Sequence, residues 1–455
     1  MEHIEGNLTT GSISKVLAKL SIPIITAAFL STAYNITDMA WIGKLGGNAL
    51  AGVGVGSMYS WLSQGLSTLA RMGGQVLVAQ ELGKGRKEDA SAYAVASVQL
   101  TVLFGILFGV ISLIFTDPMV AFFGLKNAEA LEVAKIYLQI TCGLILFSYL
   151  GQTLTGLYTA QGDSRSPLKA NFIGLMVNMI LDPLLILGIG PFPKLGASGA
   201  AIATVTAQLI VVVVLMLKSH GANAEHSVLG RRRVWEIQEV RYTGAVLKMG
   251  APSALQGTIY PMISMVISRM AGEFGDAAIA VLRVGGQIES LTWNIANGFG
   301  SAMNAFAAQN YGAGKMKRVR QGYKISLVIV AVWAGFISLL FIFVPKPISS
   351  IFFHTAEEIR LSADYLTVIG VGEMFMCVEL MSVGSISGLG NTKVCSVISI
   401  IFTAIRIPLA MVLSRTSLGV DGLWWALTIS SIIKGILFVI TFYKECRKKE
   451  NGLLF

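Results

Sequence analysis

The chain is a series of long apolar runs separated by short polar loops. Most runs are about 20 residues or longer, which is the length that a helix needs to cross a hydrocarbon core of roughly 30 Å. Membrane barrels instead alternate apolar and polar residues over strands of roughly ten residues. Only helices and closed barrels satisfy every backbone polar group in lipid. The pattern therefore predicts an all-α polytopic membrane protein.

The apolar runs predict twelve transmembrane helices. Several are longer than the minimum, which indicates tilt or ends that project from the bilayer. No short basic start with a brief apolar core and a small-residue cleavage site precedes the first run, so we expect no cleaved signal peptide. The predicted spans lie near residues 14–43, 49–80, 91–115, 130–160, 167–189, 196–217, 242–270, 277–308, 322–344, 360–386, 394–414 and 420–443.

The two halves of the chain repeat. Six spans per repeat is an even number, so both halves have the same orientation in the membrane. Parallel repeats of this kind form secondary transporters whose halves rock around a site between them. We therefore expect two pseudo-symmetric six-helix lobes around a central cavity. Pairs at an interval of 229 residues include Pro23 and Pro252, Gly43 and Gly272, Gln80 and Gln309, and Gly83 and Gly312.

A polar stretch divides the halves and sets the domain boundaries. We predict an N-lobe at 1–217, a cytoplasmic linker at 218–241 and a C-lobe at 242–455. The linker carries the run Arg231–Arg233. This run could contact anionic lipid, but we favour a plain determinant of topology.

Composition and charge agree with a membrane protein. Apolar residues make up 54% and charged residues 13% of the chain, against about 25% charged in soluble domains. Four cysteines are too few to stabilise a chain of 455 residues by disulfide bonds, which excludes a secreted disulfide scaffold. The net charge is +10, with about 23 basic residues on one predicted side and about 8 on the other.

The side rich in basic residues is predicted to be cytoplasmic. Both termini then lie in the cytoplasm, and the protein is expected in the inner (plasma) membrane. A basic face for nucleic acid is not expected, because the charges sit in short loops. We expect membrane lipids as neighbours and a monomer.

The motifs of the chain occur in a characteristic order. They are Tyr34-Asn35-Ile36-Thr37-Asp38, then Ala79-Gln80-Glu81-Leu82-Gly83-Lys84-Gly85, then Gln161-Gly162-Asp163, then Asn178-Met179-Ile180-Leu181-Asp182-Pro183. Over essentially the whole chain this pattern resembles the multidrug and toxic compound extrusion (MATE) family. The resemblance implies twelve-helix exporters with two six-helix lobes, driven by Na⁺ or H⁺ antiport.

The resemblance also bears on the branch of the family. Asp38 and Asp182 match the two N-lobe acids of the DinF-like and related branches. The NorM-like branch places an acid in the seventh helix, where this chain has Tyr260. The resemblance therefore favours the DinF-like branch and puts a C-lobe cation site in doubt.

Ionisable side chains at membrane depth are candidates for function because they are costly to insert. At a rise of 1.5 Å per residue, Asp38, Asp182 and Thr204 lie roughly 9, 10 and 12 Å below the outer helix ends. Asn178 and Tyr34 precede the two acids by one turn and share their faces. The family resemblance implies Asp38, Asn178, Asp182 and Thr204 as the Na⁺ ligands.

The chemistry of this group suits a monovalent cation or a proton, since hard cations take oxygen ligands. Two carboxylates in a poorly hydrated pocket repel each other, so a proton could replace Na⁺. Pro183 has no N–H and frees the carbonyl of Met179, which could supply a ligand or a hinge. The alternative is that the Asp-Pro pair only shapes the helix. We favour the functional interpretation.

The C-lobe carries a different set of charges. At the C-lobe positions that correspond in the repeat to the N-lobe acids, arginines lie nearby instead. We therefore expect a single cation site, in the N-lobe. An interhelical structural pair is the simpler interpretation of the C-lobe charges, but Glu373 is our candidate for contacting a cationic substrate. We expect Arg71 to lie near the inner interface, against lipid headgroups or a loop carboxylate. The C-lobe charges are Arg283, Glu289, Glu373, Glu379 and Arg406.

These observations predict a cation-coupled exporter of organic cationic or amphipathic small molecules, such as drugs or toxic organic cations. Tyr34, Met179, Tyr260 and Glu373 are the candidates for the substrate cavity. The alternative is a flippase for lipid-linked intermediates, which should line its cavity with basic residues. No phosphate loop, metal motif or nucleophile–base pair is found, so we expect no enzyme, no catalytic residues and no cofactor beyond the coupling ion.

Overall fold

The computed structural model describes residues 7–125, 127–220 and 227–452, apart from the side chains of residues 35 and 36. All regular secondary structure in these ranges is helical. Residues 221–226 of the predicted linker lie outside the described residues.

The chain forms two compact units. The first comprises Ile22–Ala254, and the second comprises Leu8–Ser21 with Leu255–Phe455. Two long helices, α1 (Ile13–Gly43) and α10 (Val240–Gly272), contribute residues to both units. The division thus falls inside α10, whereas the predicted lobes divide at the linker.

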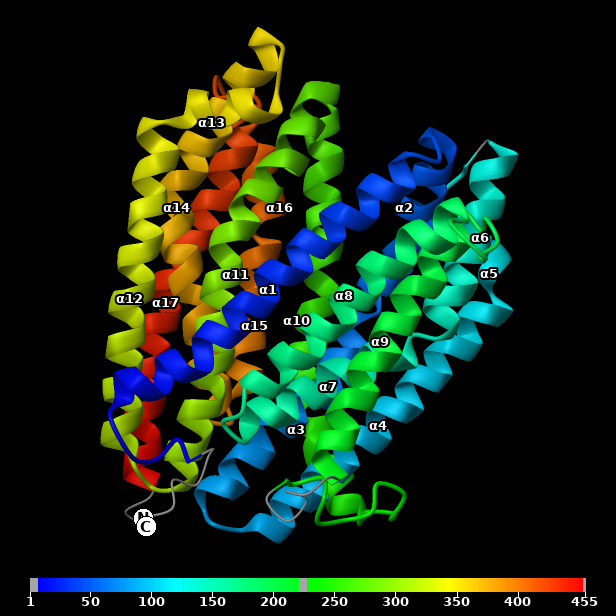
Figure 1. The fold of residues 1–455 in the computed structure, drawn as a ribbon. Helices are drawn as coiled ribbons and strands as arrows, with labels where there is room; N and C mark the ends of the chain where they lie inside the picture. The colour runs from blue at the N-terminus through cyan, green and yellow to red at the C-terminus, as the bar shows by residue number, and fades with distance from the viewer. Residues whose placement is uncertain (1–6, 126, 221–226, 453–455) are drawn as a thin grey trace. The chain divides into compact units, whose positions relative to one another are not determined.

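The first unit is built from paired helices (Figure 1). In it, α3 packs against α4 and α7, α8 against α9, and α2 against α6. Its helices besides parts of α1 and α10 are α2 (Gly47–Leu62), α3 (Gln64–Gly83), α4 (Lys87–Ile114), α5 (Thr116–Ala121), α6 (Ala128–Gly143), α7 (Leu146–Ala160), α8 (Arg165–Leu187) and α9 (Ala197–His220).

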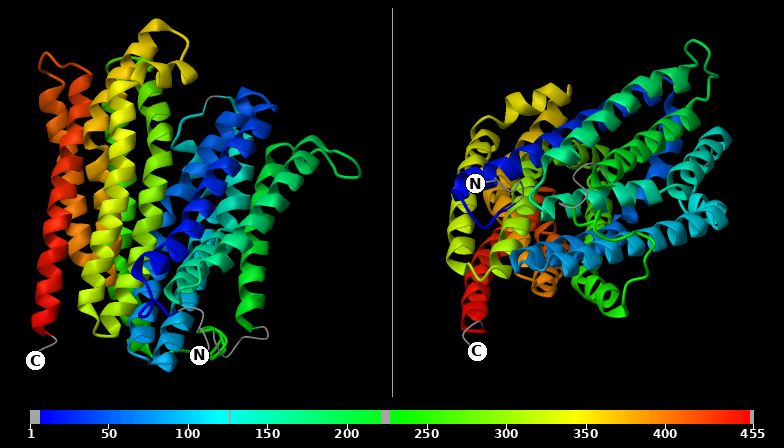
Figure 2. Two further views of the ribbon diagram at one scale, coloured as in Figure 1. Left: turned by 60° about the vertical axis from the view of Figure 1, so that its left-hand side comes forward. Right: turned by 60° about the horizontal axis from the view of Figure 1, so that its bottom comes forward.

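The second unit is centred on α14, which packs against α11, α12 and α17 (Figure 2). Glycine allows the closest of these contacts: a Cβ atom on Gly384 of α14 would lie 2.0 Å from the carbonyl oxygen of Gly300 on α11. Its helices besides parts of α1 and α10 are α11 (Asp276–Gly312), α12 (Met316–Phe343), α13 (Pro345–Phe352), α14 (Ala356–Gly388), α15 (Thr392–Ala404), α16 (Arg406–Leu413) and α17 (Asp421–Gly452).

The helix bounds follow the 229-residue interval read from the sequence. Gly43 ends α1 and Gly272 ends α10, while Gly83 ends α3 and Gly312 ends α11. The two halves differ at Ser63, where α2 gives way to α3 although the equivalent α11 is continuous. The repeated sequence therefore folds into repeated helices, with a break in one copy.

Each of the twelve predicted spans coincides with helix. Among the described residues, eight helical segments are long and apolar enough to cross a membrane, or nine if α6 and α7, bent by 43°, form one span. The segments α2, α3, α10 and α11 do not meet this test. The count of twelve spans stays a prediction.

Polar loops of the first unit lie close together. Lys218 Nζ pairs with Asp163 Oδ2 at 3.0 Å, and Arg231 Nη1 with Glu88 Oε1 at 3.5 Å. The hydroxyl of Ser91 donates to the Val228 carbonyl at 2.6 Å, so the described part of the linker packs on this unit. In the second unit, Arg320 pairs with Glu450 and Asn391 donates to Glu445. The cytoplasmic orientation of these loops stays a prediction.

Candidate functional site

Three helices bring the predicted cation ligands together in the first unit. Asp38 lies on α1, Asn178 and Asp182 lie one turn apart on α8, and Thr204 lies on α9. The exposed fraction is 8% for Asp38, 1% for Asn178 and 0% for Asp182. The one-turn spacing places Asn178 and Asp182 on one face of α8, and that face is buried.

Hydrogen bonds join these side chains across helices. With its amide oriented to suit its neighbours, Asn178 donates from Nδ2 to Asp182 Oδ2 at 2.8 Å and accepts from the Thr204 backbone N–H at 3.2 Å. The Tyr34 hydroxyl lies 2.9 Å from Thr204 Oγ1. A connected polar network therefore runs from α1 through α9 to α8.

Two carboxylate oxygens of this network have no hydrogen-bond partner among the described residues. They are Oδ1 of Asp38 and Oδ1 of Asp182, and both are buried. The two acids are close enough for their charges to interact. Unpartnered buried polar atoms are costly, so this arrangement favours an occupant that binds carboxylate oxygens.

Tyr137 of α6 lies near this group and was not among the predicted site residues. This residue is 6% exposed and lies close enough to Asp38, Asp182 and Tyr34 for electrostatic interaction. No motif or charge in its span singles it out, and only the packing of α6 beside this group identifies it.

A cavity of about 380 Å³ adjoins the network within the first unit. Tyr34, Asn178 and Thr204 line it, as does Arg71 of α3. The expectation that Arg71 contacts lipid headgroups or a loop carboxylate is wrong, because its side chain lines this cavity. The expectation assumed one straight helix over 49–80, whereas the helix is broken at Ser63.

The predicted substrate residue Met179 is not among the residues lining this cavity. Its side chain is 39% exposed. It follows Asn178 directly on α8, and consecutive helical residues point in different directions, about 100° apart. The buried face of α8 therefore includes Asn178 and excludes Met179.

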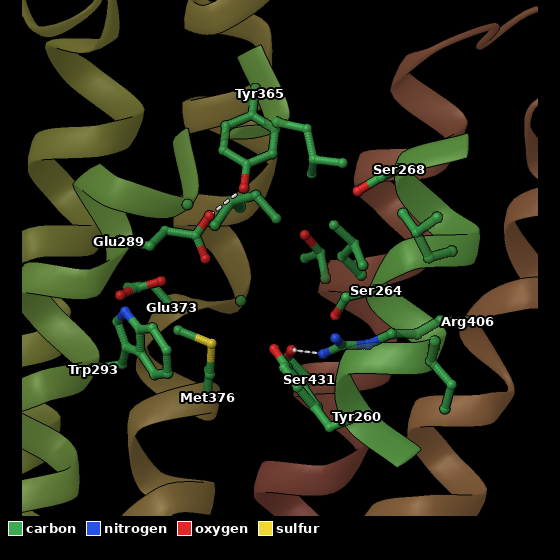
Figure 3. A pocket seen from close by; sticks show the side chains of 18 of the residues that line it. Tyr260, Ser264, Ser268, Glu289, Trp293, Tyr365, Glu373, Met376, Arg406 and Ser431 are labelled. Atoms are coloured by element: carbon green, nitrogen blue, oxygen red, sulfur yellow. Dashed lines mark hydrogen bonds between the residues drawn. The ribbon is translucent and has the colours of Figure 1, made fainter. Parts of the chain in front are cut away.

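A second cavity, of about 260 Å³, lies within the second unit and includes the predicted residues Tyr260 and Glu373. Figure 3 shows Glu289 and Glu373 on one wall and Arg406 on the opposite wall. Glu373 is 1% exposed. The Thr292 hydroxyl lies close to its carboxyl group, yet neither carboxylate oxygen has a partner with hydrogen-bond geometry among the described residues.

Other charges of the second unit are held by neighbours. The Tyr365 hydroxyl donates to Glu289 (Figure 3). Arg406 donates from Nε to Ser430 Oγ and from Nη2 to Ser431 Oγ, both at 3.1 Å. These contacts compensate Glu289 and Arg406 in part and leave Glu373 open.

A buried ion pair in the second unit includes a residue that sequence analysis passed over. Lys434 Nζ of α17 lies 2.9 Å from Glu379 Oε1 of α14, and the two side chains are 3% and 7% exposed. The sequence does contain a signal for Lys434, because a lysine inside an apolar span is rare and usually has a function or an ion-pair partner. The sequence predicted an interhelical structural pair among the C-lobe charges, and Glu379 forms such a pair with Lys434.

Comparison with known proteins identifies the family. The family model described as MatE matches residues 23–184 and 252–412. A probable multidrug resistance protein NorM of Thermotoga maritima is 26% identical over 444 residues, which is 94% of this chain and 92% of that relative. An FAD transporter of Shewanella oneidensis is 26% identical over 438 residues, 94% of each chain.

Solved structures share the fold. The Vibrio cholerae MATE transporter VcmN in its bent form superposes with a TM-score of 0.88 at 19% identity, covering 97% of this chain and 99% of that chain. Because the MatE model matches more than half of the chain, the chain belongs to the MATE family of multi-pass membrane transporters and is not an enzyme.

Proposed function

We propose that the protein is a secondary active exporter in the plasma membrane that moves organic amphipathic molecules, cations among them, in exchange for Na⁺ or H⁺. The observation that supports this most directly is the buried pair Asp38 and Asp182 with its open carboxylate oxygens. The relatives named as multidrug resistance proteins support a drug-like cargo. They do not favour the flippase alternative.

The donor set fits a hard monovalent cation. Asp38, Asp182, Asn178 and Thr204 offer oxygen atoms, which Na⁺ prefers, and a proton can bind either carboxylate instead. When bound, the ion supplies the positive charge that the open oxygens lack. Asn178 orients Asp182 through its hydrogen bond, and Tyr34 links the group to the adjoining cavity through Thr204.

Coupling follows from differential affinity. Ion binding neutralises Asp38 and Asp182, and a cationic group in the adjoining cavity then loses its attraction to them. Such a coupling free energy is reciprocal, so the cargo lowers the affinity for the ion by the same factor. Cargo leaves when the ion enters, which is the requirement for antiport.

We further propose a monomer of the DinF-like branch with cytoplasmic termini. The tyrosine at position 260, in place of the NorM-like acid, supports the branch. Relatives named NorM do not distinguish between the branches. In the second cavity, Glu373 and Tyr260 are proposed as further contacts for the cargo, since both line the cavity and the Glu373 carboxylate has no hydrogen-bond partner among the described residues.

Proteoliposomes loaded with the fluorescent cation rhodamine 123 test the proposal. A Na⁺ gradient and a pH gradient, imposed separately, identify the coupling ion by which of them drives export. Asp38→Asn and Asp182→Asn should each abolish gradient-driven export while leaving the fold intact. Asp117→Asn, at an exposed ion pair with Lys135, is the control and should export normally. Undiminished export by Asp38→Asn would refute the coupling mechanism.

A further inference from the structure

Arg71 is the one charged residue among the described residues that line the cavity of the first unit. The remaining lining residues are apolar, hydroxyl-bearing or amide-bearing. Asp38 and Asp182 lie beyond Tyr34, Asn178 and Thr204 and do not line the cavity themselves. A cavity expected to hold organic cations therefore has a cationic residue in its lining.

Among the described residues, no acid forms an ion pair with the Arg71 guanidinium. The Nε atom of Arg71 is buried and has no hydrogen-bond partner among the described residues. No acid of those residues offsets its burial either. Its stem lies against Gly156 of α7, where a Cβ atom would come within 3.0 Å of Arg71 Cγ. Arg71 therefore lies beside the cavity and has no charged partner among the described residues.

A buried charge without a partner is costly, and a compensating charge from a ligand removes that cost. The planar guanidinium suits carboxylate and phosphate groups, which it binds through two parallel hydrogen bonds. The amides of Gln152, Asn171 and Gln208 line the same cavity and can hydrogen-bond to such a ligand. Phe147 and Leu30 offer apolar surface for its remaining part.

We propose that this cavity selects amphipathic molecules that carry a carboxylate or phosphate group, and that Arg71 pairs with that group. The proposal rests on the proposed function, in that it takes this cavity as the one that cargo enters. A cationic group on the same molecule would face Tyr34 and the acids beyond it. The preferred cargo is then zwitterionic, with its negative end at Arg71 and its positive end toward the ion site.

Two dyes that differ in one group test the proposal by binding. Rhodamine 110 carries a free carboxylate, and rhodamine 123 is its methyl ester. Fluorescence anisotropy with the purified full-length protein in lipid nanodiscs should show rhodamine 110 binding about 10- to 100-fold more tightly, the range expected for a charge-assisted contact. Arg71→Gln should abolish this preference, and Arg71→Lys should keep part of it because a lysine retains the charge without the planar fork.

Arg320→Gln is the matched control, because Arg320 pairs with Glu450 and is not among the residues that line either cavity; its preference should equal that of the wild type. Competition by benzoate and by phenyl phosphate identifies the anionic group, and displacement by neither would overturn the proposal. Equal affinity of the wild type for both dyes would also overturn it, even if Arg71→Gln failed to fold. Gradient-driven export of rhodamine 123 tests the proposed function separately, so either idea can fail alone.

Discussion

The buried ion pair of the second unit gives the sharpest test of how its charges act. Lys434→Met removes the cation and leaves Glu379 unpaired between α14 and α17. Both side chains are less than a tenth exposed, and Lys434 Nζ also lies 3.4 Å from Thr403 Oγ1. Breaking a buried pair by removing one partner costs about 3–5 kcal/mol, because the remaining charge has no compensation. We therefore expect Lys434→Met to lower the free energy of unfolding by about that amount.

Replacing both partners should cost far less. The variant Lys434→Met/Glu379→Met removes both charges and keeps similar volumes, and such replacements are often neutral or stabilising by about 1–4 kcal/mol. The single variants Lys434→Met and Glu379→Met with the double variant form a thermodynamic cycle. Because the double variant should cost little, the magnitude of their coupling energy should approach the sum of the costs of the two single replacements.

Unfolding of the purified protein by SDS in mixed micelles measures these free energies. Arg320→Met is the control, because Arg320 and Glu450 form a pair whose side chains are 39% and 28% exposed, and such exposed pairs contribute about 0–1 kcal/mol. If Lys434→Met costs no more than Arg320→Met, water reaches the pair and the reasoning is wrong. If the double variant is as unstable as the single ones, the charges do not compensate each other.

The remaining predictions concern a helix cap and a helix contact. Burial raises the pKa of Asp163, but hydrogen bonds from Ser166 and the Lys218 ammonium outweigh it and hold this pKa below its ordinary value. Its stabilising contribution is therefore full above about pH 4 and is lost as the pH falls through the lowered pKa. Asp163→Ala should cost about 1–2 kcal/mol near pH 7, as for other lost caps, and a cost that persists unchanged at pH 2–3 in SDS titrations would contradict this. Gly384→Ala should destabilise by about 1–3 kcal/mol or more through overpacking, whereas Gly335→Ala, where a Cβ atom meets nothing within 4 Å, should not; equal melting temperatures of these two variants would refute the contact.

The long apolar runs and the repeat located the segments that fold into helix, but not breaks such as the one at Ser63. A run of apolar residues in lipid has few alternatives to helix, and the interval between Gly43 and Gly272 reappears in the helix ends. The grouping of helices into units was less predictable. A helix such as α10 belongs partly to each unit, and nothing in a continuous apolar run indicates which neighbour each half contacts.

The candidate site could be predicted where its residue types are rare in apolar spans and where its residues lie on one helix. Two acids in apolar spans are conspicuous, and the one-turn spacing of Asn178 and Asp182 fixes their shared face. Tyr137 and Arg71 depend instead on which helices pack together. Counting residues along a straight span places Arg71 by depth, but depth does not determine whether a side chain faces lipid or a cavity.

The two units use equivalent positions for different chemistry. Asp38 corresponds in the repeat to Ile267, which lines the second cavity beside Arg406. Asp38 and Asp182 of the first unit each keep an oxygen without a hydrogen-bond partner among the described residues, as does Glu373 of the second. In the second unit, however, Lys434 pairs with Glu379 and two serines accept hydrogen bonds from Arg406. An open carboxylate can exchange its occupant, but a paired one is fixed by its partner. The repeat therefore gives both units the same helices, and the ion site that we propose depends on acids that only the first unit carries at those positions.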